Sequence, residues 1–239
     1  MTRSSIGGKQ IRYAQTCSVF TIQSASFRSG FDTLSDSAIS NLNYYASNYL
    51  RKSISWVGHV GTGRGGCCGG SVGPSWHYHY RAWDIDRIQW SDSSFLDICN
   101  HAHASSSRKT RRQYIAVDAI LRRYYGTVLD GWYDSKHVNH FHVDSGCTVG
   151  PLSKTKKSHT VFIQAAANNL IGTNLTIDGV WGPLTQNAYQ AMLVSLCMTC
   201  LNPLSNTSHF LTFLAYIAMH GFKDQALGYY KYSCTPCAV

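Results

Sequence analysis

The chain has 239 residues, of which 44% are hydrophobic, enough to build a sizeable buried core and to exclude a disordered tail. Lys and Arg outnumber Asp and Glu by 21 to 12 with no run of five like charges, so the net charge of +9 is spread over the surface and favours an anionic partner. No stretch approaches the roughly 18 uninterrupted apolar residues of a membrane helix, and we expect no membrane span.

The first half of the chain predicts helices and a strand. Apolar residues recur at steps of three and four between Leu34 and Leu50, which predicts a helix. Segment 53–60 predicts a strand, because aromatic and β-branched residues alternate in it, and the glycines of 61–74 predict a loop. A second helix is predicted over 111–126, with Gly126 as its C-terminal stop.

The composition changes at residues 150–158, which are basic, contain Pro and Ser and are almost free of apolar residues. This pattern predicts a linker between one domain over 1–149 and a second over 159–239. Three helices are predicted in the second domain, over 160–172, 183–196 and 209–222, and Pro183 suits the first position of its helix.

Nine cysteines are many for a cytosolic chain of this size and indicate an oxidising compartment. We therefore expect a secreted protein, although the first twenty residues contain no apolar run typical of a signal peptide. The odd count leaves at least one thiol free or paired between chains. Two Cys-x-x-Cys pairs, Cys197 with Cys200 and Cys234 with Cys237, suit either a structural zinc ion or disulfides, and secretion favours disulfides.

Two segments carry candidate metal ligands. In "SWHYHYRAWD", His77 and Asp84 stand seven positions apart, and in "HVNHFHVD", His140 and His142 stand two apart, so they share one face of a strand. Catalytic zinc usually takes three protein ligands and keeps a fourth position for water. A single histidine is more often a surface or hydrogen-bonded residue, but the two segments together would complete such a site.

The first segment has the form Ser-x-His and Ala-x-Asp separated by four residues, and "HVNHFHVD" follows it about sixty residues later. This combination resembles the zinc D-alanyl-D-alanine carboxypeptidases and murein endopeptidases. These share a fold with lysostaphin-type peptidases and the hedgehog signalling domain, and the resemblance spans residues 54–145. It implies an α+β fold in which a small antiparallel sheet with flanking helices holds a zinc site, followed here by a small three-helix domain. It also implies hydrolysis of peptide bonds in peptidoglycan stem peptides by metal-activated water, as a carboxypeptidase or an endopeptidase.

The resemblance implies that His77, Asp84 and His142 bind Zn²⁺. His140 would then lie beside the metal and hydrogen-bond the activated water or the oxyanion, with His137 near enough in sequence to assist. An alternative alignment, with relatives that end in Glu-x-x-His, would make His140 the third ligand.

Four other residues bear on this site. Relatives use an upstream arginine to hold a substrate carboxylate, and Arg64 is the candidate here, although a solvated loop cation fits it equally well. Where many relatives have an acid, this chain has Asn139, and an amide cannot act as a general base. The base must then be His140, His137, another carboxylate or absent, and the alternative function is a weak or inactive wall-binding protein that keeps the peptidase fold. We assign Asp86 to structure or to orienting a histidine, and expect His79 to be exposed.

The second domain contains the run Asp-Gly-x-Trp-Gly-Pro-x-Thr from Asp178 to Thr185. This run resembles the three-helix peptidoglycan-binding domain that is often joined to wall hydrolases, and it covers about residues 159–195. The expected partner is peptidoglycan or its peptide stems, bound by a monomer. No nucleic-acid-binding motif accompanies the positive charge, so nucleic acid is not an expected partner.

Overall fold

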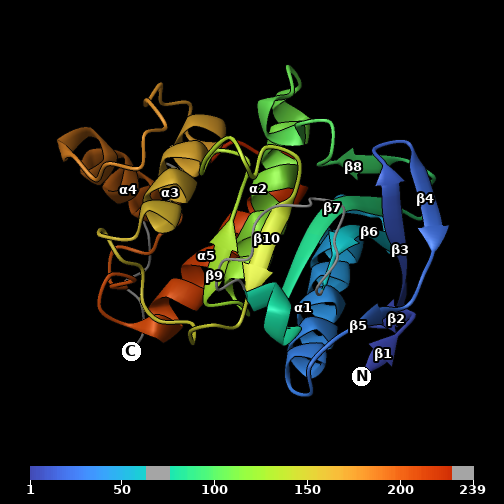
Figure 1. Cartoon of the computed structure of the whole chain (residues 1–239). Helices are drawn as coiled ribbons and strands as arrows, with labels where there is room; N and C mark the ends of the chain where they lie inside the picture. The colour runs from blue at the N-terminus through green and yellow to red at the C-terminus, as the bar shows by residue number, and fades with distance from the viewer. Residues whose placement is uncertain (63–75, 228–239) are drawn as a thin grey trace.

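The computed structural model describes residues 1–62 and 76–227 and has a mixed α+β architecture (Figure 1). Its main sheet runs in the order β2-β3-β6-β7-β10-β9, with β4 paired to β3 and β8 paired to β7. The strands of this sheet are β2 (Ser5–Ile6), β3 (Lys9–Thr16), β4 (Val19–Ile22), β6 (Ile54–Gly61), β7 (Ala82–Trp90), β8 (Phe95–Asp97), β9 (Thr127–Leu129) and β10 (Phe141–Asp144). A separate antiparallel pair is formed by β1 (Thr2–Arg3) and β5 (Ala25–Ser26).

The α+β class predicted from the sequence is confirmed, but the main sheet is larger than the small antiparallel sheet that we expected. Strands β3 and β6 run parallel, whereas the other strand pairs described in this sheet are antiparallel. The difference arises because the N-terminal segment adds β2, β3 and β4, in which apolar residues show little alternation. In β3, for example, Ile11 and Ala14 are the buried residues of eight.

Each of the five predicted helical segments contains a helix, with ends shifted by a few residues. The helices are α1 (Phe31–Tyr45), which continues as the π-helical turn Ala46–Leu50, α2 (Arg108–Arg122), α3 (Lys157–Leu170), α4 (Pro183–Ser195) and α5 (Thr207–Phe222). Helix α3 begins inside the predicted linker, because Lys156 is extended and the lysine that follows is a good helix former. Gly126 lies beyond the end of α2, where a Cβ would overlap the carbonyl oxygen of Cys147.

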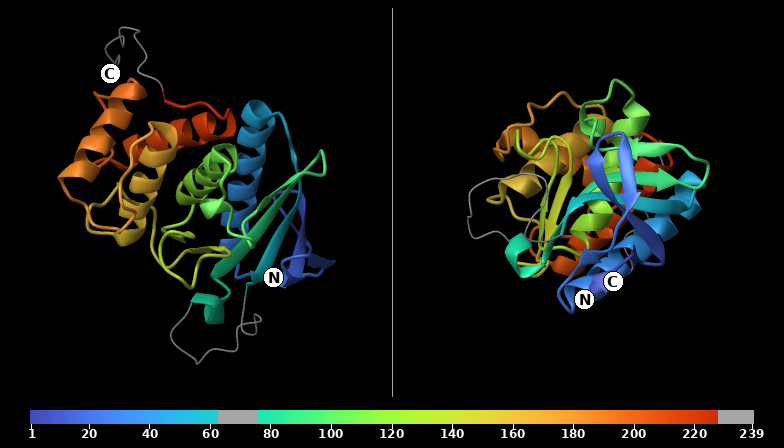
Figure 2. Two further views of the ribbon diagram at one scale, coloured as in Figure 1. Left: turned by 90° about the horizontal axis from the view of Figure 1, so that it is seen from above. Right: turned by 45° about the vertical axis from the view of Figure 1, so that its right-hand side comes forward.

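The core of the sheet faces α1 and α2, which cover one side of it (Figure 2). Strand β7 contributes Trp83 and Trp90 to this core, both almost fully buried. The ring of Tyr114 on α2 stacks on Phe141 of β10 with the ring centroids 4.3 Å apart. Helix α2 therefore anchors β10 immediately before the candidate ligand His142.

The three predicted helices of the C-terminal part are present; α5 and α3 pack on α2, and α4 packs on α3. A Cβ on Gly221 of α5 would lie 2.5 Å from the carbonyl oxygen of Arg112, so the two helices approach closely. Arg112 also donates a hydrogen bond of 2.9 Å to the carbonyl oxygen of Asn169 on α3. Buried apolar residues from both parts form one core cluster. The division into two domains at residues 150–158 stays a prediction.

The expected disulfide chemistry is present. Cys17 and Cys99 form a disulfide that joins the β3–β4 turn to the segment after β8, and Cys147 is free and exposed. Cys197 and Cys200 are also disulfide-bonded, so their thiols are not available as zinc ligands. Within the described ranges, none of the helices combines the length and apolar character that crossing a bilayer requires.

Candidate metal centre

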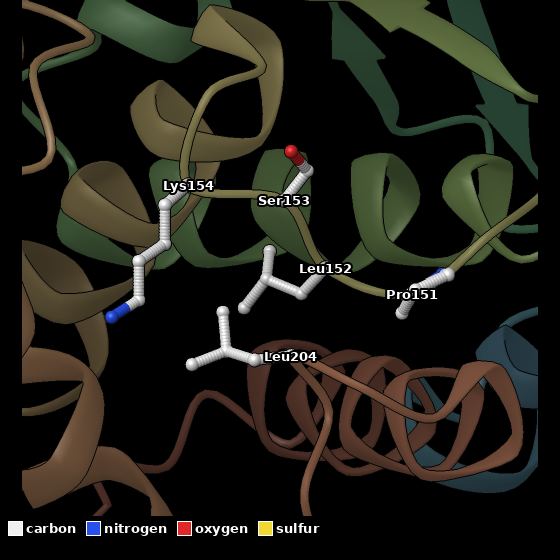
Figure 3. Close-up of a pocket in the computed structure, with 5 residues that line it drawn as sticks. All are labelled: Pro151, Leu152, Ser153, Lys154 and Leu204. Atoms are coloured by element: carbon white, nitrogen blue, oxygen red, sulfur yellow. The ribbon is translucent and has the colours of Figure 1, made fainter.

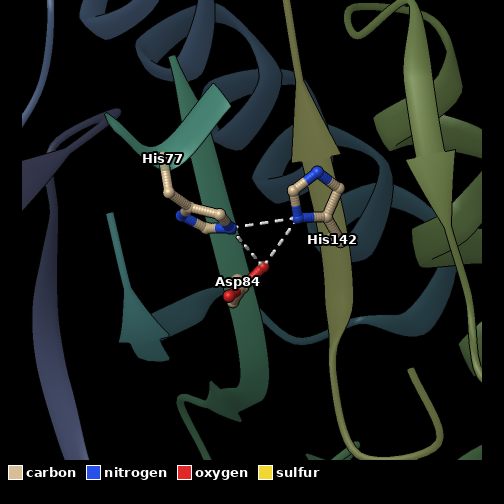
Figure 4. A group of neighbouring side chains, drawn as sticks. All are labelled: His77, Asp84 and His142. Atoms are coloured by element: carbon tan, nitrogen blue, oxygen red, sulfur yellow. Dashed lines mark hydrogen bonds and ion pairs between the residues drawn. The ribbon is translucent and has the colours of Figure 1, made fainter. Parts of the chain in front are cut away.

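A cross-strand pair and a short turn bring the candidate ligands together. Strands β7 and β10 are antiparallel neighbours, and His142 lies opposite Asp84 in their register, so both side chains reach the same side of the sheet. His77 comes from the 3-10 turn Trp76–His79. Tyr80 follows with a left-handed φ of 55°, and β7 begins two residues later. Figure 4 shows the three side chains pointing toward one another.

The atoms that face one another are Nε2 of His77, Oδ1 of Asp84 and Nδ1 of His142. Nδ1 of His142 lies 3.0 Å from Oδ1 of Asp84 and 3.1 Å from Nε2 of His77. The remaining distance, from Nε2 of His77 to Oδ1 of Asp84, is 3.3 Å. These three atoms thus form a nearly equilateral triangle.

This triangle fits a metal ion. Ligand atoms bound to zinc at about 2.0–2.1 Å with tetrahedral angles are about 3.3–3.4 Å apart, close to the distances found here. The donor set of two imidazoles and one carboxylate is also one that zinc accepts while a fourth position stays open. The group of His77, Asp84 and His142 could therefore hold a metal ion.

The charges around these residues favour a cation. Burial would raise the pKa of Asp84, but hydrogen bonds with His142 and His77 hold that pKa well below its usual value. Burial would lower the pKa of His142, but its hydrogen bonds with Asp144 and Asp84 raise it to about 9. Two carboxylates, those of Asp84 and Asp144, therefore flank the His142 ring and stabilise positive charge on it.

His140 lies beside the centre rather than within the triangle. Its Nε2 is 3.7 Å from Oδ1 of Asp84, and its Nδ1 is 2.8 Å from Oδ1 of Asn139. Burial lowers the pKa of His140, which favours the neutral ring. Of the two alignments considered from the sequence, the geometry brings His142 into the ligand group and leaves His140 as its neighbour.

His137 is paired with a carboxylate that we did not single out from the sequence. Nδ1 of His137 lies 2.6 Å from Oδ1 of Asp134, and the ring centroid of His137 is 5.3 Å from that of His140 and 6.0 Å from that of His142. Burial would raise the pKa of Asp134, but the hydrogen bond with His137 lowers it. The i, i+3 spacing of Asp134 and His137 was the available signal, because it allows the two side chains to meet in a turn.

The remaining site predictions have mixed outcomes. His79 is exposed, as expected, whereas Arg64 lies outside the described residues. Asp86 is fully buried, and its carboxylate has no hydrogen-bond partner among the described residues, so the structural one of its two predicted roles fits and the orienting one does not. Oδ1 of Asp86 packs against Gly58, where a Cβ would lie 2.6 Å from it and 2.7 Å from the ring of Phe20. Burial raises the pKa of Asp86 to about 7. The β4 strand that carries Phe20 was not predicted from the sequence.

A surface hollow of about 350 Å³ lies away from these ligands (Figure 3). It is lined by Pro151, Leu152, Ser153, Lys154 and Leu204. These residues belong to the segment before α3 and to the turn before α5, so the hollow is part of the helical half of the molecule.

Comparison of the chain with models of protein families, with curated proteins and with solved structures gives no match. A functional assignment therefore depends on the geometry of the metal centre and on the motifs that form it.

Proposed function

We propose that this protein is a zinc-dependent hydrolase that cleaves peptide bonds in the stem peptides of peptidoglycan. The observation that carries the proposal is the triangle of ligand atoms from His77, Asp84 and His142, which two sequence segments about sixty residues apart contribute. The spacing of these residues resembles that of the zinc carboxypeptidases and endopeptidases of the bacterial wall.

The proposal gives the three ligands and His140 different roles. His77, Asp84 and His142 would hold the zinc ion, which when bound supplies Lewis acidity to polarise a carbonyl group and to acidify water. Nδ1 of His140 donates to Oδ1 of Asn139, so the neutral His140 ring would present the lone pair of Nε2 to the site and accept a hydrogen bond from the attacking water.

The Asp134–His137 pair supplies the proton acceptor that Asn139 cannot provide. The carboxylate of Asp134 holds Nδ1 of His137 at 2.6 Å, which leaves Nε2 as the atom that takes and returns a proton. A histidine oriented by a carboxylate is a common general base, because its unperturbed pKa is close to neutral pH. In this proposal Asn139 orients His140 and takes no part in proton transfer.

The helical half would bind the wall. Its Asp178–Thr185 run forms a turn in which Gln164 of α3 donates hydrogen bonds to Oδ1 of Asp178 at 2.8 Å and to Oγ1 of Thr185 at 3.1 Å. Gly179 has a φ of 74°, which a glycine adopts without strain. These contacts fit the structural part that the run plays in peptidoglycan-binding domains. The net charge of +9 suits an anionic wall, and the Cys17–Cys99 disulfide suits secretion.

The second candidate function is a wall-binding protein that keeps the peptidase fold and the metal centre without turnover. Asn139 favours it, because an amide stands where relatives have an acid. The two candidates differ in whether the Asp134–His137 pair replaces that acid in catalysis.

The test is incubation of the purified full-length protein with peptidoglycan and soluble muropeptides, with and without a chelator, followed by mass analysis of the products. We expect cleavage that the chelator abolishes and zinc restores. His142→Ala should lose both zinc and cleavage, whereas His79→Ala is the matched control, because His79 lies in the same turn as His77 but is exposed. Binding to the wall without cleavage of any wall type would support the second candidate. Full zinc occupancy in His142→Ala would instead favour His140 as the ligand.

A further inference from the structure

Asp144 is a buried carboxylate next to the metal centre. It lies two residues after His142 on β10, so both side chains project from the same face of the strand. Asp144 is 3% exposed, and its Oδ2 lies 3.2 Å from Nε2 of His142. Its other oxygen, Oδ1, accepts a hydrogen bond of 2.8 Å from the backbone N–H of Gly146.

We propose that Asp144 is a positioning residue of the metal centre, and this inference rests on the proposed zinc site. The carboxylate accepts the N–H of Nε2 on His142, so the proton that the ring would give up to a metal ion is the one on Nδ1, which leaves the lone pair on that atom. Nδ1 is the atom that faces Oδ1 of Asp84 and Nε2 of His77. Carboxylates that hold the second nitrogen of a metal-binding histidine set its tautomer, orientation and basicity.

The second oxygen of Asp144 extends this effect to the turn that carries His77. Asp144 accepts the backbone N–H of Gly146. Gly146 in turn packs so closely against the indole of Trp76 that a Cβ on Gly146 would overlap the indole nitrogen. Trp76 is the first residue of the 3-10 turn that includes His77. One carboxylate therefore supports two of the three ligands, His142 directly and His77 through Gly146 and Trp76.

Arg81 reinforces the same arrangement from the start of β7. Its guanidinium donates hydrogen bonds to the hydroxyl and the carbonyl oxygen of Ser145, the residue between Asp144 and Gly146. It also lies 5.0 Å from the centroid of the Trp76 ring, within the range of a cation–π interaction. The segment 144–146 is thus held against the turn by contacts that do not involve the ligands.

The geometry makes Asp144→Asn an informative change. The carboxylate accepts two hydrogen bonds with two oxygens, whereas an amide has one acceptor oxygen and an NH₂ group that donates. Asn would leave either Nε2 of His142 or the N–H of Gly146 without an acceptor. Either outcome should weaken zinc binding while the sheet that carries the ligands stays intact.

The experiment is a zinc titration of the full-length apo protein against a competing chelator, with Co²⁺ absorption as a second readout of ligand geometry. We expect Asp144→Asn to weaken zinc binding by about 10- to 100-fold. Asp92→Asn is the matched control, because Asp92 also accepts side-chain and backbone hydrogen bonds but sits in the exposed turn after β7; it should bind zinc as the wild type does. Circular dichroism of both apo variants checks that they are folded.

Three results would overturn the inference. If the wild type binds zinc and Asp144→Asn binds it within about threefold of wild type, the positioning role is wrong while the proposed function survives. If the wild type binds no zinc, the proposed function and this inference both fail. Should Asp144→Asn not fold, ¹⁵N NMR of the zinc-loaded wild type decides: we expect His142 protonated on Nε2, and a proton on Nδ1 would refute the assignment.

Discussion

Acid should destabilise the protein through His159, a buried histidine far from the metal centre in sequence. It lies in the first turn of α3, is 7% exposed, and its Nδ1 accepts the N–H of Ser153 at 2.9 Å. Burial, with added repulsion from Arg122 and Lys156, lowers the pKa of His159 from 6.5 to about 3. The ring also packs against Phe210 of α5, so a charged ring would be surrounded by apolar atoms and cations.

The sign follows from the lowered pKa. The unfolded chain binds the proton more tightly than the folded protein, so the stability that depends on neutral His159 is fully present above about pH 6.5. It decreases as the pH falls from 6.5 toward 3 and then levels off. Each pH unit in this window costs about 1.4 kcal/mol, so at pH 5 the loss from His159 is about 2 kcal/mol.

The assay is urea unfolding at pH 7.5 and pH 5.0 for the wild type and for His159→Asn. Asparagine does not titrate, and its carbonyl oxygen can accept the N–H of Ser153. The loss of unfolding free energy between the two pH values should therefore be about 2 kcal/mol smaller in the variant. His209→Asn controls for the substitution, because Nδ1 of His209 accepts the N–H of Asn202 at the exposed surface. An equal loss in His159→Asn and wild type would refute the reasoning.

Two further predictions concern stability. The Cys17–Cys99 disulfide spans a sequence separation of 82 residues, so the double variant Cys17→Ala/Cys99→Ala should lower the free energy of unfolding by about 4.5 kcal/mol. Urea unfolding measures this loss, and Cys147→Ala, which removes a free thiol, is the control. A loss below about 1 kcal/mol would contradict the loop-entropy argument. Gly126→Ala places a Cβ against the carbonyl oxygen of Cys147 and should cost about 1–3 kcal/mol. Gly150→Ala, with open space around its Cβ, should cost much less, and equal melting temperatures for the two variants would show that this contact relaxes freely.

The candidate ligands could be found from the sequence because each segment has a strong local pattern. His77 and Asp84 lie in one aromatic segment and His142 in another, and a strand places alternate residues on one face. The partners that orient these ligands were harder to recognise. Asp134 and Asp144 are ordinary acidic residues until the chain places them at 2.6 Å from Nδ1 of His137 and 3.2 Å from Nε2 of His142.

Asn139 shows why a motif alone was insufficient. In the sequence it is a departure that removes the expected acid. In the structure its Oδ1 lies 2.8 Å from Nδ1 of His140, and Asp134 pairs with His137 nearby. Whether a polar residue donates, accepts or orients depends on the neighbours that folding brings to it.

The sequence by itself determined the helices, because the 3.6-residue period of apolar residues is a local property, and the ligand-bearing segments were recognised by their resemblance to zinc peptidases. The tertiary structure decided how these parts pair. The parallel contact of β3 with β6, the antiparallel register that sets His142 against Asp84 and the packing of α5 on α2 join residues far apart in the chain. Strand pairing is stabilised by neighbours across the sheet rather than along it, and a linear pattern does not specify which strand that neighbour will be.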